Sequence, residues 1–259
     1  MIISRYFIGF VFFSFLGWVW ECLFCMINTG KWENRGFLFG PYCPIYGSAV
    51  MLAYFIFGHH RLSINSSLII VFLICMIGSA VIEYVTSYIL EKIYHARWWD
   101  YSNIPFNIKG RIALPISVAF GIAGIIIVKF VFPIVNNHFP PHHSLFAESL
   151  SLLLMGLISI DLGVTLSTLS EVVYHLNMTE KQLGNRIQWI YDRVGEETEE
   201  LREQWDNYSN YITIKISQVA ESINRREWKS LKKMTHFTTN NQTYIVNKLK
   251  KLKDRMNKK

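Results

Sequence analysis

The run from Leu68 to Leu90, LIIVFLICMIGSAVIEYVTSYIL, is the clearest indication of which kind of structure this chain adopts. It contains a single charged side chain, that of Glu83. A helix needs about 20 mostly apolar residues to cross a hydrocarbon core roughly 30 Å thick. This run therefore predicts a membrane-spanning helix, and it places the chain among integral membrane proteins.

Other long apolar runs lie on both sides of this one. Of the residues in the chain, 51% are hydrophobic, and five segments approach or meet the spanning length. Glu21 lies inside the first run, and no small-x-small cleavage site follows it, so we expect a retained helix and not a signal peptide. The sequence predicts an all-α integral membrane domain over residues 1–173, with helices at about 6–27, 37–57, 68–90, 112–135 and 145–173.

Residues 174–259 have a different composition and predict a cytoplasmic helical tail. Apolar residues recur at steps of three and four from Leu183 to Ile223, which indicates an amphipathic helix. Its apolar stripe would be buried either in a coiled coil or on the protein's own cytoplasmic face. Thr179-Glu-Lys-Gln182 has the pattern of a capping box that would begin this helix. From Arg225 to Lys259 there are twelve basic and two acidic residues, so we expect attraction to anionic lipid head groups, with no nucleic-acid partner.

The distribution of lysine and arginine predicts the orientation. Cytoplasmic loops of membrane proteins are enriched in these residues. They gather after the first and third predicted helices and in the tail. The pattern favours an N-terminus outside, a C-terminus in the cytoplasm and five crossings of the cell membrane of a bacterium.

The second predicted helix is irregular where it begins. Gly36 to Gly47 holds two prolines and three glycines, which disfavour a continuous helix. Irregular backbone at membrane depth has to be buried in protein or face a water-filled cavity. We therefore predict a broken helix whose regular part starts at Pro44. The loop residues of interest are Gly40, Pro41, Cys43, Pro44, Tyr46 and Gly47.

Two carboxylates, Glu21 and Glu83, lie at similar depth in the cytoplasmic half of the predicted membrane domain. Ionisable residues at such positions are costly, so each is a candidate functional residue. Arg35 and Arg111 enter from the same side. Two interpretations stay open: the four residues form buried structural ion pairs, or they line a pocket for a polar or charged part of a substrate. Ser87 and Glu91 share the Glu83 face of their helix and join this candidate cluster, and Asp161 is a further candidate.

The segment between the third and fourth predicted helices is rich in aromatic and charged residues. Its tryptophans and tyrosine suit the membrane interface. If the segment is helical, Arg97 and Asp100 can pair at i, i+3. His95 and Asp100 could form an acid–base pair. The interfacial motif comprises His95, Arg97, Trp98, Trp99, Asp100, Tyr101 and Asn107.

No nucleophile or metal-ligand constellation accompanies these residues, so we predict no catalytic residue, no metal and no cofactor. The histidines of the outer loops, His59, His60, His142 and His143, are interpreted as solvated.

Several ordered motifs resemble one protein family. They are Phe15–Glu21, Asn34–Gly47, Glu83–Tyr84 with Glu91–Lys92, His95–Ser102 and Asn107–Leu114. Over about Phe7 to Pro133 they are similar to the putative ABC-transporter type IV family, the CmpB-like permease proteins. The resemblance implies a membrane subunit of an ATP-driven transporter, and five helices imply a homo-oligomer. The sequence has no G-x-x-x-x-G-K-[ST] phosphate loop, so the ATP-binding subunit would be a separate protein.

Three functional hypotheses follow. The first is a permease-like transport component with a buried glutamate and arginine cluster open to the cytoplasm. The second is a membrane scaffold or regulatory protein that binds a partner or anionic lipid through its tail. The third and least favoured is an intramembrane enzyme that acts on lipid.

Overall fold

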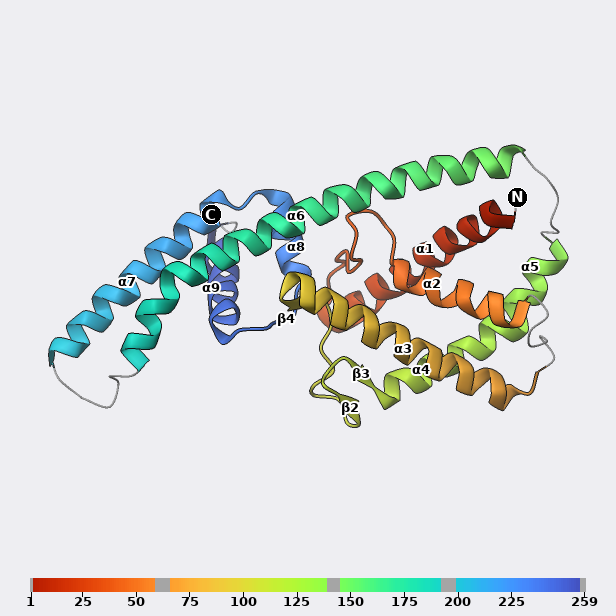
Figure 1. The fold of residues 1–259 in the computed structure, drawn as a ribbon, viewed down its shortest axis with the longest axis horizontal. Helices are drawn as coiled ribbons and strands as arrows, with labels where there is room; N and C mark the ends of the chain where they lie inside the picture. Colours follow the sequence, from red (N-terminus) through yellow and green to blue (C-terminus); the bar gives the residue numbers. More distant parts are fainter. Residues whose placement is uncertain (1, 59–65, 139–144, 192–198, 257–259) are drawn as a thin grey trace. The chain divides into compact units, whose positions relative to one another are not determined.

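A computed structural model describes residues 2–58, 66–138, 145–191 and 199–256, and Figure 1 shows the order of the elements. The helices are α1 (Ile2–Thr29), α2 (Pro44–Ala53), α3 (Leu68–Tyr94), α4 (Leu114–Ile126), α5 (Phe132–His138), α6 (Leu145–Tyr191), α7 (Glu199–Ser222), α8 (Arg225–Lys233) and α9 (Asn240–Met256). Two π-helical turns, η1 (Tyr54–Gly58) and η2 (Ile127–Val131), continue α2 and α4. The strands are β1 (Ala96–Arg97), β2 (Asn107–Ile108), β3 (Ile112–Ala113) and β4 (His236–Phe237).

Four helical segments are long and apolar enough to cross a membrane, which confirms an all-α membrane protein. They are Ile3–Ile27, Leu68–Tyr94, Leu114–Asn136 and Leu145–Lys181. The fifth predicted segment is the shorter apolar helix Pro44–Gly58. Its start at Pro44 confirms the predicted break, and residues 37–43 form no regular element. At 1.5 Å per residue this helix is only about 22 Å long.

The chain packs as two compact units. The membrane unit comprises Met1–Ile89 and Trp99–Thr165, and the tail unit comprises Leu90–Trp98 and Leu166–Lys259. The last turn of α3 and strand β1 thus belong to the tail unit. The boundary at residue 173 between membrane and cytoplasm stays a prediction.

Small residues let the helices of the membrane unit approach closely. A β-carbon at Gly17 would collide with the ring of Tyr46, and one at Gly47 would collide with Ser14 on α1. Between α3 and α4, a β-carbon at Gly124 would collide with Cys75. Close backbone approach at small residues is typical of helix pairs in membranes. These contacts hold α1 against α2 and α3 against α4.

The apolar core of the membrane unit lies where the two π-helical turns meet. Its buried members are Val50, Tyr54, Phe57, Val71, Val128 and Phe132. The rings of Tyr54 and Phe132 meet edge to face, with centroids 5.0 Å apart.

One face of α3 is unburied along its whole length. Exposed apolar side chains recur at every fourth position: Ile69, Leu73, Ile77, Val81, Val85, Ile89 and Ile93. Only 11% of the most apolar part of α3 is buried within the chain. This ridge suits contact with lipid or another membrane helix, whereas Glu83 and Ser87 are buried.

The predicted capping box at Thr179 is wrong, because α6 continues unbroken from Leu145 to Tyr191. The Thr179 hydroxyl donates to the His175 carbonyl at 2.7 Å, as in a helix interior. The sequence from Val173 to Gln182 contains no proline or glycine that would stop the preceding helix.

The tail unit has an apolar core of its own. Ile212, Ile216 and Ile223, from α7 and its C-terminal end, are buried together with residues of α8, β4 and α9: Trp228, Leu231, Phe237, Ile245 and Leu249. This part of the apolar stripe is therefore buried without a partner chain. The coiled-coil prediction for Leu183 to Tyr208 concerns side chains outside the described set.

Strands β1 and β4 form an antiparallel pair in the tail unit, with Ala96 opposite Phe237 and Arg97 opposite His236. Thr235 and Thr238 reinforce the pair through their backbone N–H groups, which donate to the carbonyls of Arg97 and His95 at 2.8 Å and 2.9 Å. The segment after α3 is thus held by residues about 140 positions later in the chain.

Candidate functional site

The loop over residues 37–43 is held by a carboxylate from α6. The backbone N–H groups of Phe39 and Gly40 donate to the two oxygens of Asp161 at 3.1 Å and 2.8 Å. Successive backbone amides of this kind form a concavity for an anion. A β-carbon at Gly40 would lie 2.8 Å from the Asp161 Oδ2 atom, so this approach requires glycine. Asp161, whose role the sequence left open, therefore holds the break in the second helix.

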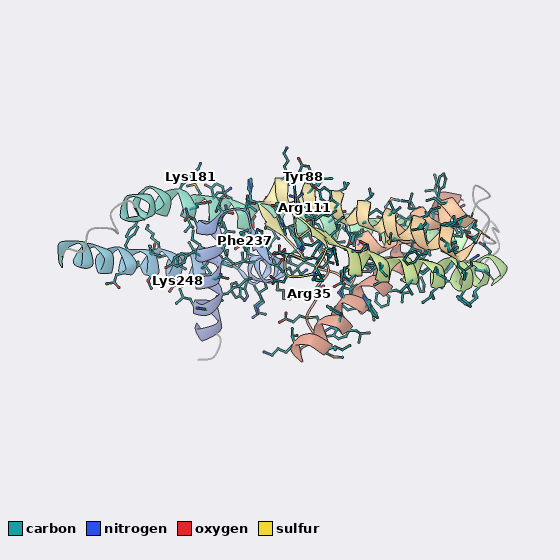
Figure 2. All side chains as sticks on the ribbon, turned by 90° about the horizontal axis from the view of Figure 1, so that it is seen from below. Arg35, Tyr88, Arg111, Lys181, Phe237 and Lys248 are labelled. Carbon is teal, nitrogen blue, oxygen red and sulfur yellow. The ribbon has the colours of Figure 1, made fainter. Side chains whose placement is uncertain are left out.

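Asn34 satisfies further polar groups at the same loop. Its Oδ1 atom accepts hydrogen bonds from the Trp18 indole N–H at 2.9 Å and from the Gly36 N–H at 3.0 Å. Its Nδ2 atom donates to the Phe39 carbonyl at 2.8 Å. The neighbouring Arg35 is exposed (Figure 2), and it makes no hydrogen bond or ion pair with any residue whose placement is described.

The first carboxylate, Glu21, is held by a tyrosine from α2. The Tyr46 hydroxyl donates to the Glu21 Oε1 atom at 2.5 Å. Gly17 leaves space for the Tyr46 ring on α1, and the Cys43 N–H donates to the Ser14 carbonyl at 2.9 Å. The α1–α2 contact thus sets the position of the Tyr46 hydroxyl.

The second carboxylate, Glu83 on α3, is held by a tyrosine from the loop that follows the tail-unit strand β1. The Tyr101 hydroxyl donates to the Glu83 Oε1 atom at 3.2 Å. The backbone of Tyr101 is fixed by its N–H, which donates to the Gly110 carbonyl at 2.8 Å. Burial raises the pKa of the Tyr101 phenol, and the nearby Glu83 and Glu21 carboxylates raise it further. The phenol therefore stays protonated and remains a donor.

A short hairpin builds the backbone that holds Tyr101. Strands β2 and β3 pair with Ile108 opposite Ile112, and Lys109 and Gly110 between them have φ angles of 52° and 67°. Two successive positive φ values are what a type I′ turn requires. Asn107 supports the turn, since its Oδ1 atom accepts from the Gly110 N–H at 3.0 Å and its Nδ2 atom donates to the Ile104 carbonyl at 2.8 Å.

The two carboxylate–tyrosine pairs are neighbours. Glu21 lies close enough to interact electrostatically with both Glu83 and Tyr101. Glu83 is 7% exposed, and its Oε2 atom has no hydrogen-bond partner among the described residues. One turn further along α3, the Ser87 hydroxyl is also buried and has no hydrogen-bond partner among the described residues. Glu83 is buried and Glu21 is partly buried, and two like charges at such positions repel each other, so the arrangement favours a proton, a cation or additional donors.

Arg111 packs against two tyrosines of α3, the helix that carries Glu83. Its guanidinium carbon lies 5.4 Å from the ring centroid of Tyr84 and 5.1 Å from that of Tyr88 (Figure 2). These distances are typical of cation–π contacts. The Trp99 indole N–H donates to the Arg111 carbonyl at 3.0 Å. Arg111 is thus held by aromatic residues on the helix that carries Glu83.

The remaining motif residues have other partners. Glu91 and Arg97 form a two-pronged ion pair in the tail unit, with Nε–Oε2 and Nη2–Oε1 distances of 2.7 Å and 2.9 Å. Asp100 accepts from the backbone N–H and hydroxyl of Ser102 at 3.0 Å and 2.5 Å. The segment is built of strand and turns, so the helical geometry needed for the i, i+3 pair of Arg97 and Asp100 is not met.

Two residues of the motif with ring side chains, His95 and Trp98, contact the C-terminal end of α3. His95 is exposed and has a φ of 53°, and its N–H donates to the Glu91 carbonyl at 2.9 Å. This is a left-handed C-terminal cap of the helix. Trp98 is buried, and its ring lies 5.9 Å from that of Tyr94.

Among the described residues, no group of three or more histidine, cysteine, aspartate or glutamate side chains is placed to hold a metal ion. The outer-loop residues His59, His60, His142 and His143 lie outside the described ranges. No disulfide bond joins any two of the four cysteines, Cys22, Cys25, Cys43 and Cys75, all of which lie within the described ranges.

The site residues of the membrane unit lie within the part of the chain that matches a known family. The family model described as "Putative ABC-transporter type IV" matches residues 8–166. Neither the curated proteins nor the solved structures gave a match to the chain. The family match covers more than half of the residues, and it includes both carboxylate–tyrosine pairs and Asp161. The chain therefore belongs to the putative ABC-transporter type IV family.

Proposed function

We propose that the chain is the permease-like membrane component of an ATP-driven transporter, and that Glu21, Tyr46, Glu83 and Tyr101 bind a positively charged group of its substrate. We call these four residues the carboxylate–tyrosine cluster. The observation that carries the proposal is that the two neighbouring carboxylates accept hydrogen bonds only from neutral tyrosine hydroxyls among the described residues. A cation between them would relieve their mutual repulsion.

The same chain shows what a structural ion pair looks like. Glu91 and Arg97 meet through two short bonds, and both charges are neutralised locally. A tyrosine hydroxyl orients a carboxylate without neutralising it. This difference supports a binding role for Glu21 and Glu83 over the alternative role of structural struts with Arg35 and Arg111.

Other subunits complete the proposed transporter. The sequence carries no phosphate loop, so a separate subunit supplies ATP binding. A cavity in the membrane unit, lined in part by Arg5, Tyr6 and Tyr54, measures about 50 Å³, far below the roughly 300 Å³ of small ligand pockets. The exposed ridge of α3 suits a second copy of the chain, which would enlarge the enclosed space. We further propose a cytoplasmic C-terminus, from the distribution of lysine and arginine.

The proposal is tested with Glu21→Gln and Glu83→Gln in the full-length chain, purified from its host. Glutamine keeps the shape and removes the charge. We expect both variants to accumulate normally and to copurify with an ATP-binding protein, while cationic solute no longer copurifies. Glu171→Gln, an exposed position on α6, is the matched control. Loss of the folded protein in the two cluster variants would instead support the strut interpretation.

A second candidate function is a membrane scaffold or regulatory protein that acts through its tail. The observation in its favour is that the tail unit buries a core of its own and exposes basic side chains on α8. If no ATP-binding protein copurifies, and if removal of Tyr174 to Lys259 abolishes function while the Glu21 and Glu83 substitutions do not, the permease proposal is wrong and this one replaces it.

A further inference from the structure

Two groups of basic residues near the C-terminus, one on α9 and one on α8, lie in different surroundings. In α9, the Lys253 ammonium donates to the carbonyls of Ala220 and Ile223 at 2.6 Å and 3.3 Å, and Lys250 donates to the carbonyl of Met234 at 3.3 Å. These carbonyls lie at the C-terminal ends of α7 and α8, where helices leave acceptors unsatisfied. The two lysines therefore cap other helices within the tail unit.

In helix α8, by contrast, most basic side chains point away from the tail core. Its side chains Trp228 and Leu231 are buried in the tail core. The other side of the helix carries only exposed basic side chains. We call this set the α8 basic face: Arg225, Arg226, Lys229 and Lys232.

The α8 basic face stands on a capped helix and has no acidic neighbour on its own helix surface. Asn224 caps the helix, since its Oδ1 atom accepts from the N–H groups of Arg226 and Glu227 at 2.9 Å and 3.0 Å. The Glu227 carboxylate in turn accepts from the Asn224 N–H at 3.0 Å and is 5% exposed. Its charge is therefore committed to the cap and is withdrawn from the surface. The backbone that carries the four cations is therefore already ordered, and binding a partner has to order only their side chains.

We propose that the α8 basic face binds anionic lipid head groups of the bilayer that holds the chain. The tail unit is joined to the membrane-spanning part through α6, a single uninterrupted helix, so the bilayer is a permanent neighbour at high effective concentration. Four cations on one face complement anionic head groups, and each raises the binding constant for the head groups about fivefold. A soluble polyanion is negatively charged like the head groups, but it has to be recruited from solution, whereas the bilayer is always present.

The test uses the full-length chain, with a donor dye at Ser222→Cys and an acceptor dye on the lipid head groups. Ser222 is exposed and precedes α8. The chain is reconstituted in nanodiscs of phosphatidylcholine alone and in nanodiscs in which phosphatidylglycerol replaces part of it. We expect energy transfer to rise with phosphatidylglycerol, to fall with salt, and to lose its lipid dependence when the four α8 residues are changed to glutamine.

A single substitution provides a milder test. Lys229→Gln should lower the binding constant for phosphatidylglycerol, fitted from a titration of the energy transfer, about fivefold. Lys181→Gln, at an exposed lysine on α6, should leave this constant unchanged. Equal transfer in both kinds of nanodisc, or a full response in Lys229→Gln and in the quadruple variant, would overturn the proposal. Binding of added RNA to α8 without any response to phosphatidylglycerol would assign the face to nucleic acid. None of these outcomes depends on transport activity.

Discussion

At the scale of single residues, two tyrosine hydroxyls hold the carboxylates of Glu21 and Glu83. We predict that Tyr46→Phe lowers stability by about 1.5–3 kcal/mol, because it leaves the partly buried Glu21 carboxylate without its donor. Tyr101→Phe should cost less, since its bond to Glu83 is 3.2 Å long against 2.5 Å for Tyr46 and Glu21. The measurement is the apparent Tm of the purified chain. Tyr174→Phe is the control, because Tyr174 is 61% exposed. Equal values for all three variants would show that neither tyrosine holds a carboxylate.

The carboxylate of Asp161 gives a second prediction at this scale. Asp161→Asn removes the charge and replaces one of the two acceptor oxygens, so the N–H groups of Phe39 and Gly40 can no longer both be satisfied. Hydrogen exchange at these two amides should accelerate at least tenfold, which corresponds to about 1.4 kcal/mol. Glu171→Gln on the same helix should have no effect there, and unchanged exchange in Asp161→Asn would refute this role.

At the scale of elements, close helix contact at glycine determines how α1 and α2 pack. Gly47→Ala should destabilise the membrane unit by about 1–3 kcal/mol, because the added methyl group meets Ser14 and the Phe10 backbone. Gly17→Ala should behave similarly against Tyr46. Gly78→Ala is the matched control, since a β-carbon there meets nothing within 4 Å. Thermal unfolding in detergent compares the three, and a Tm of Gly47→Ala equal to that of Gly78→Ala would contradict the close approach.

Apolar length and the position of proline were enough to predict most of the membrane elements. The run Leu68–Leu90 predicted α3 because a membrane demands such a length, and Pro44 predicted the start of α2 because proline suits the first turn of a helix. The capping-box prediction at Thr179 failed because a capping motif does not start a new helix where no proline or glycine ends the preceding one. Strand pairing between Ala96 and Phe237 could not be predicted, since two-residue strands carry no periodic signal.

The site was only half visible in the sequence. Glu21 and Glu83 stood out because a charge in an apolar run is costly. Tyr46 and Tyr101 were named as members of the broken-helix loop and of the interfacial motif, but neither was assigned to a carboxylate, because a tyrosine is ordinary in both a membrane helix and an interfacial loop. Which hydroxyl reaches which carboxylate depends on the fit at Gly17 and on the β2–β3 hairpin, which are properties of the folded chain.

At the scale of the whole molecule, the chain packs as two compact units, and the tail unit includes the last turn of α3. Phe237 is 5% exposed and lies opposite Ala96 in the β1–β4 pair. Phe237→Ala should destabilise the tail unit by about 3–5 kcal/mol and raise hydrogen exchange at Ala96 and Arg97. Tyr244→Ala, at a position 48% exposed on α9, is the control. Exchange at Ala96 that does not respond to Phe237→Ala would show that β4 does not hold this segment.

An untargeted profile of cationic solutes in the native host tests whether the carboxylate–tyrosine cluster binds a transported cation. A strain that lacks the chain is complemented with the wild type, with the double variant Glu21→Gln and Glu83→Gln, or with the control Glu171→Gln, at equal protein amounts. We predict that the distribution of at least one cationic solute across the membrane changes without the chain, and that the wild type and the control restore it while the double variant does not. Full restoration by the double variant, or a profile indifferent to the chain, would contradict the proposal that the carboxylate–tyrosine cluster binds the transported cation.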